Sequence, residues 1–129
     1  MGEKRNTQNS RAVGKRYEEL AASYLERQGM KIIERNFRTR NGEIDLVGRD
    51  GTYLVFIEVK FRKSGVSGSG AEAVHARKQR TICRISDYYR IRYRIPPSTP
   101  VRYDVVECGI DERGEITVTW YRHAFLYRT

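Results

Sequence analysis

Hydrophobic residues recur along this chain at two spacings, one typical of helices and the other of strands. Between Ser10 and Gln28 the apolar stripe has helical spacing, and Ser10 and Gly29 are placed to begin and end the helix. A second stripe of Val74, Ile82, Ile85 and Tyr89 predicts a helix over residues 71–92, which the following prolines stop. The polar residues 1–9 are expected to be a flexible segment before a single domain of residues 10–129.

Shorter apolar runs predict five strands, at residues 30–39, 42–48, 52–62, 101–108 and 115–121. The second and third flank Asp50-Gly51, which is a strong hairpin signal. Residues 122–127 fit either a short helix or an extension of the last strand. The predicted order is helix, three strands, helix, two strands, which indicates an α/β fold with helices packed on a mixed sheet.

Charged residues interrupt the two strands of this hairpin. One strand contains Glu43 and Asp45 in the run GEIDLV, and the next contains Glu58 and Lys60 in the run FIEVK. Because unpaired buried charges are costly, such residues are usually paired or bound to a metal. The alternative is an edge hairpin with solvated charges, but residues 53–57 are apolar on both faces, which is typical of a central strand.

The turn assignment sets the register of the hairpin. If Asp50 and Gly51 are the central turn residues, Asp45 pairs with Phe56 and Glu43 pairs with Glu58. Glu43, Asp45, Glu58 and Lys60 then share one face, with Asp45 and Glu58 as diagonal neighbours about 7 Å apart. Two carboxylates at that separation can share one cation.

The two helices add further candidates. On a helical wheel Glu18 lies at the border of the buried stripe, whereas Glu19 points away, and Gly14 leaves room one turn earlier. Glu18 can therefore reach the acids, although a boundary glutamate paired with an arginine fits equally well. Lys78 lies in the stripe of the second helix, where it either snorkels to solvent or reaches phosphate or the acids, and Gln79 flanks it.

The charge balance points to a polyanionic partner. The chain has a formal net charge of +9, and its 25 basic residues are six lysines and 19 arginines, whose planar guanidinium suits phosphate. Nucleic acid is the usual partner of such a domain, and the candidates for phosphate contacts are Arg62, Lys78, Arg90, Arg92 and Arg94. The alternatives are a generic basic surface and, for the last three, a solvated helix end.

Other features exclude several classes of protein. No apolar stretch is long enough to span a bilayer and the first 30 residues hold no signal-peptide core, so we expect a cytoplasmic protein. Cys83 and Cys108 form no CxxC pair and are expected to be buried, reduced thiols. The SGVSGSG loop at 64–70 lacks the GKS/T ending of a nucleotide-binding loop and is expected to be mobile until substrate binds.

Several of these motifs occur together in a known family. Gly14, Glu18 and Ala21, then Arg35-Asn36, GEIDLV at 42–47, FIEVKFR at 56–62, Lys78 and RYDVV at 102–106 resemble the bacterial YraN-type family. That resemblance implies a restriction-endonuclease-like fold within the PD-(D/E)XK nuclease superfamily, with Holliday junction resolvases as the nearest functional analogy. It matches Asp45 to the acidic residue of the motif, Glu58 and Lys60 to the (D/E)XK pair, and Glu18 to the helix-borne acid. Ile44 replaces the proline of the motif name.

The sequence therefore predicts a metal-dependent endonuclease acting on structured or branched DNA, in preference to RNA. Asp45, Glu58 and the Val59 carbonyl would bind Mg²⁺ or Mn²⁺, Lys60 would orient water or stabilise charge, and Glu18 would assist, with Glu43 and Gln79 supporting. A four-way junction substrate would favour a homodimer. The alternatives are a non-catalytic nucleic-acid-binding module of the same fold and a protein-interaction role in a repair complex.

Overall fold

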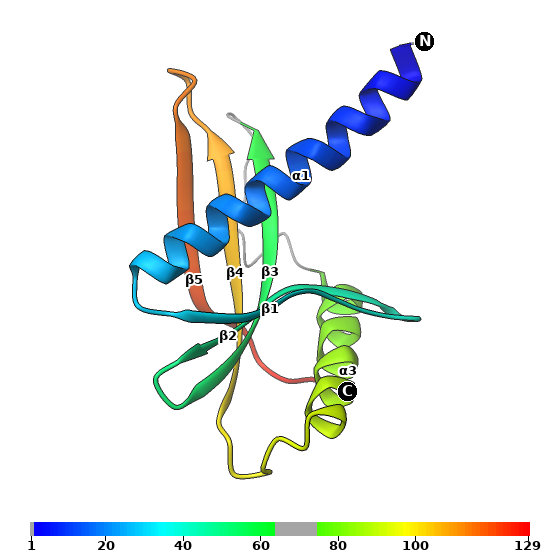
Figure 1. The fold of residues 1–129 in the computed structure, drawn as a ribbon, viewed down its shortest axis with the longest axis vertical. Coiled ribbons are helices and arrows are strands. Elements are labelled where there is room, and N and C mark those ends of the chain that lie inside the picture. Colours follow the sequence, from blue (N-terminus) through cyan, green and yellow to red (C-terminus); the bar gives the residue numbers. More distant parts are fainter. Residues whose placement is uncertain (1, 64–74) are drawn as a thin grey trace.

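In the computed structural model, five strands form one sheet in the order β1-β2-β3-β4-β5, and a helix packs on each face (Figure 1). The structure describes residues 2–63 and 75–129, with side chains for residues 12–62 and 75–129. The elements are α1 (Gly2–Arg27), β1 (Lys31–Thr39), β2 (Gly42–Asp50), β3 (Tyr53–Lys63), α3 (Ala76–Arg92), β4 (Val101–Ile110) and β5 (Ile116–Phe125). Neighbouring strands are antiparallel except β3 and β4, which are parallel.

The predicted order of elements and the central position of β3 are confirmed. Several boundaries differ by one or two residues, and three differ by more. Helix α1 begins at Gly2 instead of Ser10, because apolar periodicity marks only the packed part of a helix and polar residues can extend it. Helix α3 begins at Ala76 after an extended His75, while Val74 and the 64–70 loop lie outside the described residues. The last strand extends beyond residue 121 and ends at Phe125, so the residues that follow its predicted end extend the strand and do not form a helix.

The alternation of β3 builds two separate cores. Val55 and Ile57 face α1, and Leu54 and Phe56 face α3. Helix α1 contributes Tyr17, Ala21, Ala22 and Leu25 to the first core, and α3 contributes Ile82, Cys83, Ile85 and Tyr89 to the second. Both cysteines are buried and free, as expected. No helix in the described part of the chain is long and apolar enough to cross a bilayer.

The register of the β2–β3 hairpin differs from the prediction by two residues. Asp50 pairs with Tyr53, so Gly51 and Thr52 are the central turn residues, and Val47 rather than Asp45 lies opposite Phe56. Gly51 adopts φ +62 at the first central position, where a hairpin turn requires positive φ. Because the shift is an even number of residues, the paired residues 46–50 and 53–57 stay on their predicted faces.

The β1–β2 ribbon passes from one face of the sheet to the other. Leu46 belongs to the core under α1, whereas Phe37 and Ile44 belong to the core under α3. Asn36 has φ +54 at this point of β1, and the pairing of β2 with β3 ends at Leu46. Figure 1 shows β1 running from below the end of α1 across to the top of α3. The crossing opens the sheet beside Asp45.

Candidate functional site

Asp45 lies where β2 separates from β3. The Val59 N–H, which has no β2 partner in the ladder at this level, donates a hydrogen bond of 2.8 Å to Asp45 Oδ2. Asp45 is only 8% exposed. Because the strands separate here, the Asp45 carboxylate accepts the hydrogen bond from the backbone of β3. This hydrogen bond fixes the orientation of the carboxylate.

Glu58 is the second buried acid, 7% exposed, and two lysines approach it. Its Oε1 lies 3.9 Å from Lys60 Nζ, on the same strand, and 3.8 Å from Lys78 Nζ, on α3. Both distances exceed a hydrogen bond, so the lysines neutralise Glu58 by charge proximity. Lys78 therefore reaches the acids, which was one of the alternatives for that residue.

Glu18 and Glu43 complete a group that we call the acid cluster, consisting of Glu18, Glu43, Asp45 and Glu58. Burial, together with the negative charges of Glu58, Glu18 and Glu43, raises the pKa of Asp45 to about 8, although the hydrogen bond from Val59 lowers it. Burial also raises the pKa of Glu58, against Lys78 and Lys60, and that of Glu18. Burial and like charges thus outweigh the nearby cations at Glu18, Asp45 and Glu58.

Helix α1 presents Glu18 to the cluster, while Glu19 is exposed, as the helical wheel predicts. Hydrogen bonds with Asn36 and Asp45 and the charge of Arg38 favour the ionised form and so lower the pKa of Glu18 against burial. The predicted role of Gly14 is wrong. Among the residues whose side chains are described, a Cβ there would meet nothing within 4 Å, so α1 does not need a glycine to approach the described part of the sheet.

The other predicted residues lie in several places. Arg62 is 3.5 Å from Glu107 of β4, and Gln79 accepts a hydrogen bond from Arg128. Arg90, Arg92 and Arg94 do not form one row. Arg90 lies 3.9 Å from Asp87, Arg92 packs over Tyr93, and Arg94 follows the end of α3 with φ +50.

The acid cluster offers oxygen ligands and no histidine or cysteine. Within residues 2–63 and 75–129, no three Asp, Glu, His or Cys side chains are grouped so as to hold a metal ion. A cation here would therefore be held by the Asp45 and Glu58 carboxylates, a backbone carbonyl and water. That donor set fits Mg²⁺, which commonly takes one or two carboxylates and keeps several waters.

The sequence is similar to a large group of bacterial proteins. Residues 17–108 match the Uncharacterised protein family UPF0102. The chain belongs to this family. UPF0102 proteins of Lachnoclostridium phytofermentans and Symbiobacterium thermophilum are 47% identical over 98 residues and 43% identical over 116. These alignments cover 76% and 90% of this chain, and 83% and 98% of the relatives.

The YraN-type resemblance of the motifs is confirmed by this membership of UPF0102. The match includes all four residues of the acid cluster and both lysines. Among solved structures, Pyrococcus furiosus SfsA in complex with Ca²⁺ aligns with a TM-score of 0.38 and 15% identity. That alignment covers 88% of this chain and 63% of SfsA, and at this score it does not establish a shared fold.

A buried ion network that no sequence motif predicted lies elsewhere in this UPF0102 protein. Asp104 is fully buried and accepts hydrogen bonds from Arg102 (2.9 Å), Trp120 Nε1 (2.8 Å) and the His123 N–H (3.1 Å). Arg102 also donates to Asp50 at 2.7 Å. Burial lowers the pKa of Arg102, but the hydrogen bonds to Asp104 and Asp50 outweigh it and raise the pKa. The only sequence signal was the alternation of Arg102 and Asp104, which places them on one face.

Proposed function

We propose that this protein is a metal-dependent nuclease of the PD-(D/E)XK type with a restriction-endonuclease-like fold, acting on structured or branched DNA. The observation that carries the proposal is Asp45. This carboxylate is buried among negative neighbours, its pKa is raised to about 8, and the Val59 N–H donates a hydrogen bond to it without offsetting that rise. Such an arrangement is unfavourable for a purely structural residue and favourable for a cation site.

Asp45, Glu58 and the Val59 carbonyl would hold Mg²⁺ or Mn²⁺. When bound, such a cation supplies a Lewis acid for the scissile phosphodiester and acidifies a coordinated water. The hydrogen bond from Val59 N keeps one oxygen of Asp45 in place, and the other oxygen remains for the cation. The oxygen ligands are those that hard divalent cations prefer.

The remaining residues act on charge and protons. Lys60 is held near Glu58 and is one-third exposed, so its ammonium can contact a phosphate and stabilise negative charge that develops there. Lys78 approaches the same carboxylate from α3 and can do the same from the other side. Glu18, whose pKa is raised by burial, can accept a proton from water at neutral pH. Glu43 supports the cluster by charge alone.

Incubation with DNA substrates tests the proposal. Linear, single-stranded, flap and four-way-junction DNA, and RNA, are incubated with the protein in Mg²⁺, Mn²⁺ or EDTA. We expect cleavage of branched DNA with metal only. It should be abolished in Asp45→Asn, which preserves the acceptor for Val59, and slowed about 10²–10³-fold in Lys60→Ala. Glu19→Gln, an exposed neighbour of Glu18, is the matched control and should cleave normally.

The opposite result has a definite meaning. If no substrate is cleaved with either metal while DNA is bound in a salt-sensitive manner, the protein is a non-catalytic nucleic-acid-binding module. Cleavage that persists in EDTA, or in Asp45→Asn, would also contradict the proposal.

A further inference from the structure

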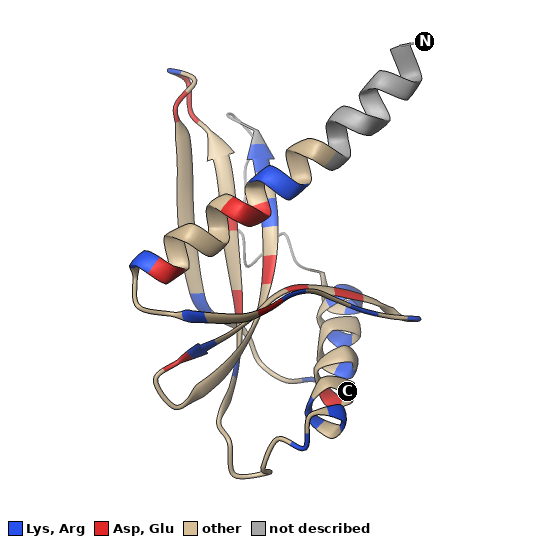
Figure 2. Cartoon of the chain, in the orientation of Figure 1, with Lys and Arg blue, Asp and Glu red and all other residues tan. Residues whose placement is uncertain are grey.

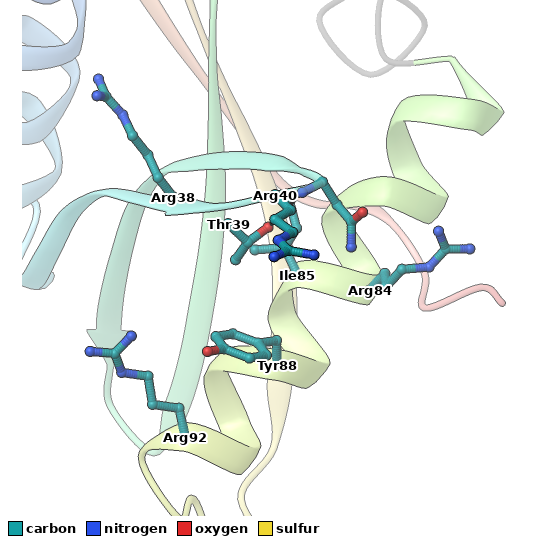
Figure 3. Close-up of a pocket in the computed structure, with 8 residues that line it drawn as sticks. Arg38, Thr39, Arg40, Arg84, Ile85, Tyr88 and Arg92 are labelled. Atoms are coloured by element: carbon teal, nitrogen blue, oxygen red, sulfur yellow. Dashed lines mark hydrogen bonds between the residues drawn. The ribbon is translucent and has the colours of Figure 1, made fainter.

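An arginine-lined cleft lies next to the acid cluster, between the β1–β2 turn and α3. Its volume is about 430 Å³, within the range of ligand-binding pockets. We call it the arginine cleft, and it is lined by Arg38, Thr39, Arg40, Asn41, Arg84, Ile85, Tyr88 and Arg92 (Figure 3). No acidic residue is among these residues.

Packing beneath the cleft fixes its shape. Gly42 takes φ +139, and a Cβ there would lie 3.6 Å from Ile85 Cδ1, so the turn rests directly on α3. Phe37 of β1 contacts the Tyr88 ring with centroids 6.1 Å apart and belongs to the core under α3. The two walls are therefore held together before any ligand binds.

The positive charge of the cleft is largely uncompensated. In the described part of the chain, no carboxylate pairs with Arg40, Arg84 or Arg92. Arg38 pairs with Glu43 at 3.2 Å, but its side chain is 76% exposed, so the pair is weak. Figure 2 shows basic positions at several levels along α3. Exposed guanidinium groups from two elements around one cleft are suited to the phosphates of a polyanion.

Tyr88 gives the cleft a second property. It is 52% exposed, and Figure 3 places its ring between Arg40 and Arg92. Arg84, Tyr88 and Arg92 are four residues apart on α3, so they follow one another at about 6 Å along the helix axis. An exposed aromatic ring among arginines is typical of surfaces that stack an unpaired base while the cations contact the backbone. Bases within a duplex are already stacked and cannot use it.

One residue that lines the arginine cleft, Arg38, also lies beside the acid cluster. Arg38 extends from the cleft toward α1 in Figure 3, and its charge lowers the pKa of Glu18. Its partner Glu43 belongs to the acid cluster. Arg38 is therefore the residue through which the cleft and the cluster adjoin.

We propose that the arginine cleft binds an unpaired nucleic-acid strand, with phosphates on Arg40, Arg84 and Arg92 and a base stacked on Tyr88. Its relation to cleavage rests on the proposed function, in which the strand bound here would be the single-stranded arm of a branched substrate. Binding itself does not depend on that function and can be measured separately.

Fluorescence anisotropy in EDTA tests the cleft without cleavage. The probes are labelled oligo-dT, a blunt duplex, and a fork with one oligo-dT arm. We expect oligo-dT and the fork to bind more tightly than the duplex. Tyr88→Ala should weaken both roughly 5- to 100-fold with little change for the duplex, whereas Tyr88→Phe keeps most affinity. Arg84→Ala should weaken oligo-dT binding and reduce its salt slope by about 0.7.

The controls and outcomes separate the two proposals. Arg113→Ala removes an exposed arginine from the β4–β5 turn and should bind as the wild type does. The proposal for the arginine cleft would be contradicted if Arg84→Ala and Tyr88→Ala both bind oligo-dT normally, or if the wild type does not bind it. This holds even if the protein cleaves DNA. Conversely, if the expected binding pattern is found and no substrate is cleaved, the proposal of strand binding by the arginine cleft is supported and the proposal of nuclease activity is contradicted.

Discussion

Asp45 and Asp104 are both buried aspartates in the sheet, yet their surroundings are opposite. Asp104 receives hydrogen bonds from Arg102, Trp120 and the His123 backbone and faces a full positive charge. In the described part of the chain Asp45 accepts a backbone hydrogen bond from Val59 and shares a side-chain hydrogen bond with Glu18, and its charged neighbours Glu58, Glu18 and Glu43 are negative. One carboxylate is compensated by the fold and the other is not.

This difference separates structure from chemistry. A buried charge that its neighbours satisfy fixes the positions of the elements around it, here β4, β5 and the β2–β3 turn. A buried charge that its neighbours oppose lowers stability and persists where a ligand restores the balance. The comparison therefore predicts opposite responses when each aspartate is replaced.

The largest effect is expected for Asp104→Ala. The change leaves the buried Arg102 with only Asp50 and should lower the free energy of unfolding by about 3–5 kcal/mol. Urea unfolding followed by circular dichroism measures it. If the variant does not fold, Trp120→Phe, which removes one donor, should still lose about 1 kcal/mol. If Asp104→Ala lowers the free energy of unfolding by less than about 1 kcal/mol, the fold does not compensate Asp104 more fully than Asp45, which contradicts the comparison.

Asp45→Asn should raise the free energy of unfolding, whereas Asp104→Ala lowers it. The native pKa of Asp45 is about 8 against an ordinary 3.8, so the native state binds more protons and its stability falls as pH rises between those values. In EDTA at pH 8 the variant should be more stable than the wild type by on the order of 2 kcal/mol. At pH 4 the two should agree. A variant that is less stable at pH 8 would show that the fold compensates Asp45.

Added cations should restore the balance at Asp45. At ten times the dissociation constant, Mg²⁺ or Mn²⁺ should stabilise the wild type by about 1.4 kcal/mol at pH 8, measured by thermal unfolding. The stabilisation should be smaller at pH 6, because protons compete for Asp45. Asp45→Asn should not respond. Equal stabilisation of the wild type and Asp45→Asn would indicate that cations bind elsewhere.

The smallest effect is expected for Lys78→Met. Its ammonium is 42% exposed and 3.8 Å from Glu58, so its loss should change the free energy of unfolding by less than about 1 kcal/mol. Urea unfolding at pH 7 measures this, with Lys60→Met as the matched variant on β3. A loss above 2 kcal/mol would mean that Glu58 is compensated as fully as Asp104.

The sequence predicted the elements because they depend on local periodicity. The four-residue spacing of α3 and the two-sided apolar character of β3 could be read directly. The register was wrong by two residues because Asp50-Gly51 and Gly51-Thr52 are both plausible turn centres. An error of two preserves the alternation of the paired residues 46–50, but Ile44 lies on the other side from Leu46 because the ribbon crosses the sheet.

Features that depend on distant residues were not predictable. The ribbon crossing depends on positive φ at Asn36, which asparagine tolerates but does not require. The Arg102 network joins β4 and β5 to the end of β2, and the arginine cleft joins a turn to α3. Arg84 and Tyr88 had helical spacing with Arg92, but nothing in the sequence placed the β1–β2 turn opposite them.

The parallel pairing of β3 with β4 has a consequence for folding. Asp45 and Glu58 belong to one hairpin and can meet early, in water, where the repulsion between them is weak. Leu54 pairs with Val101, so β4 joins β3 only after a loop of more than 40 residues closes. Dehydration of the acids accompanies that late step. We therefore expect the repulsion within the acid cluster to slow the final closure of the sheet more than the formation of the hairpin.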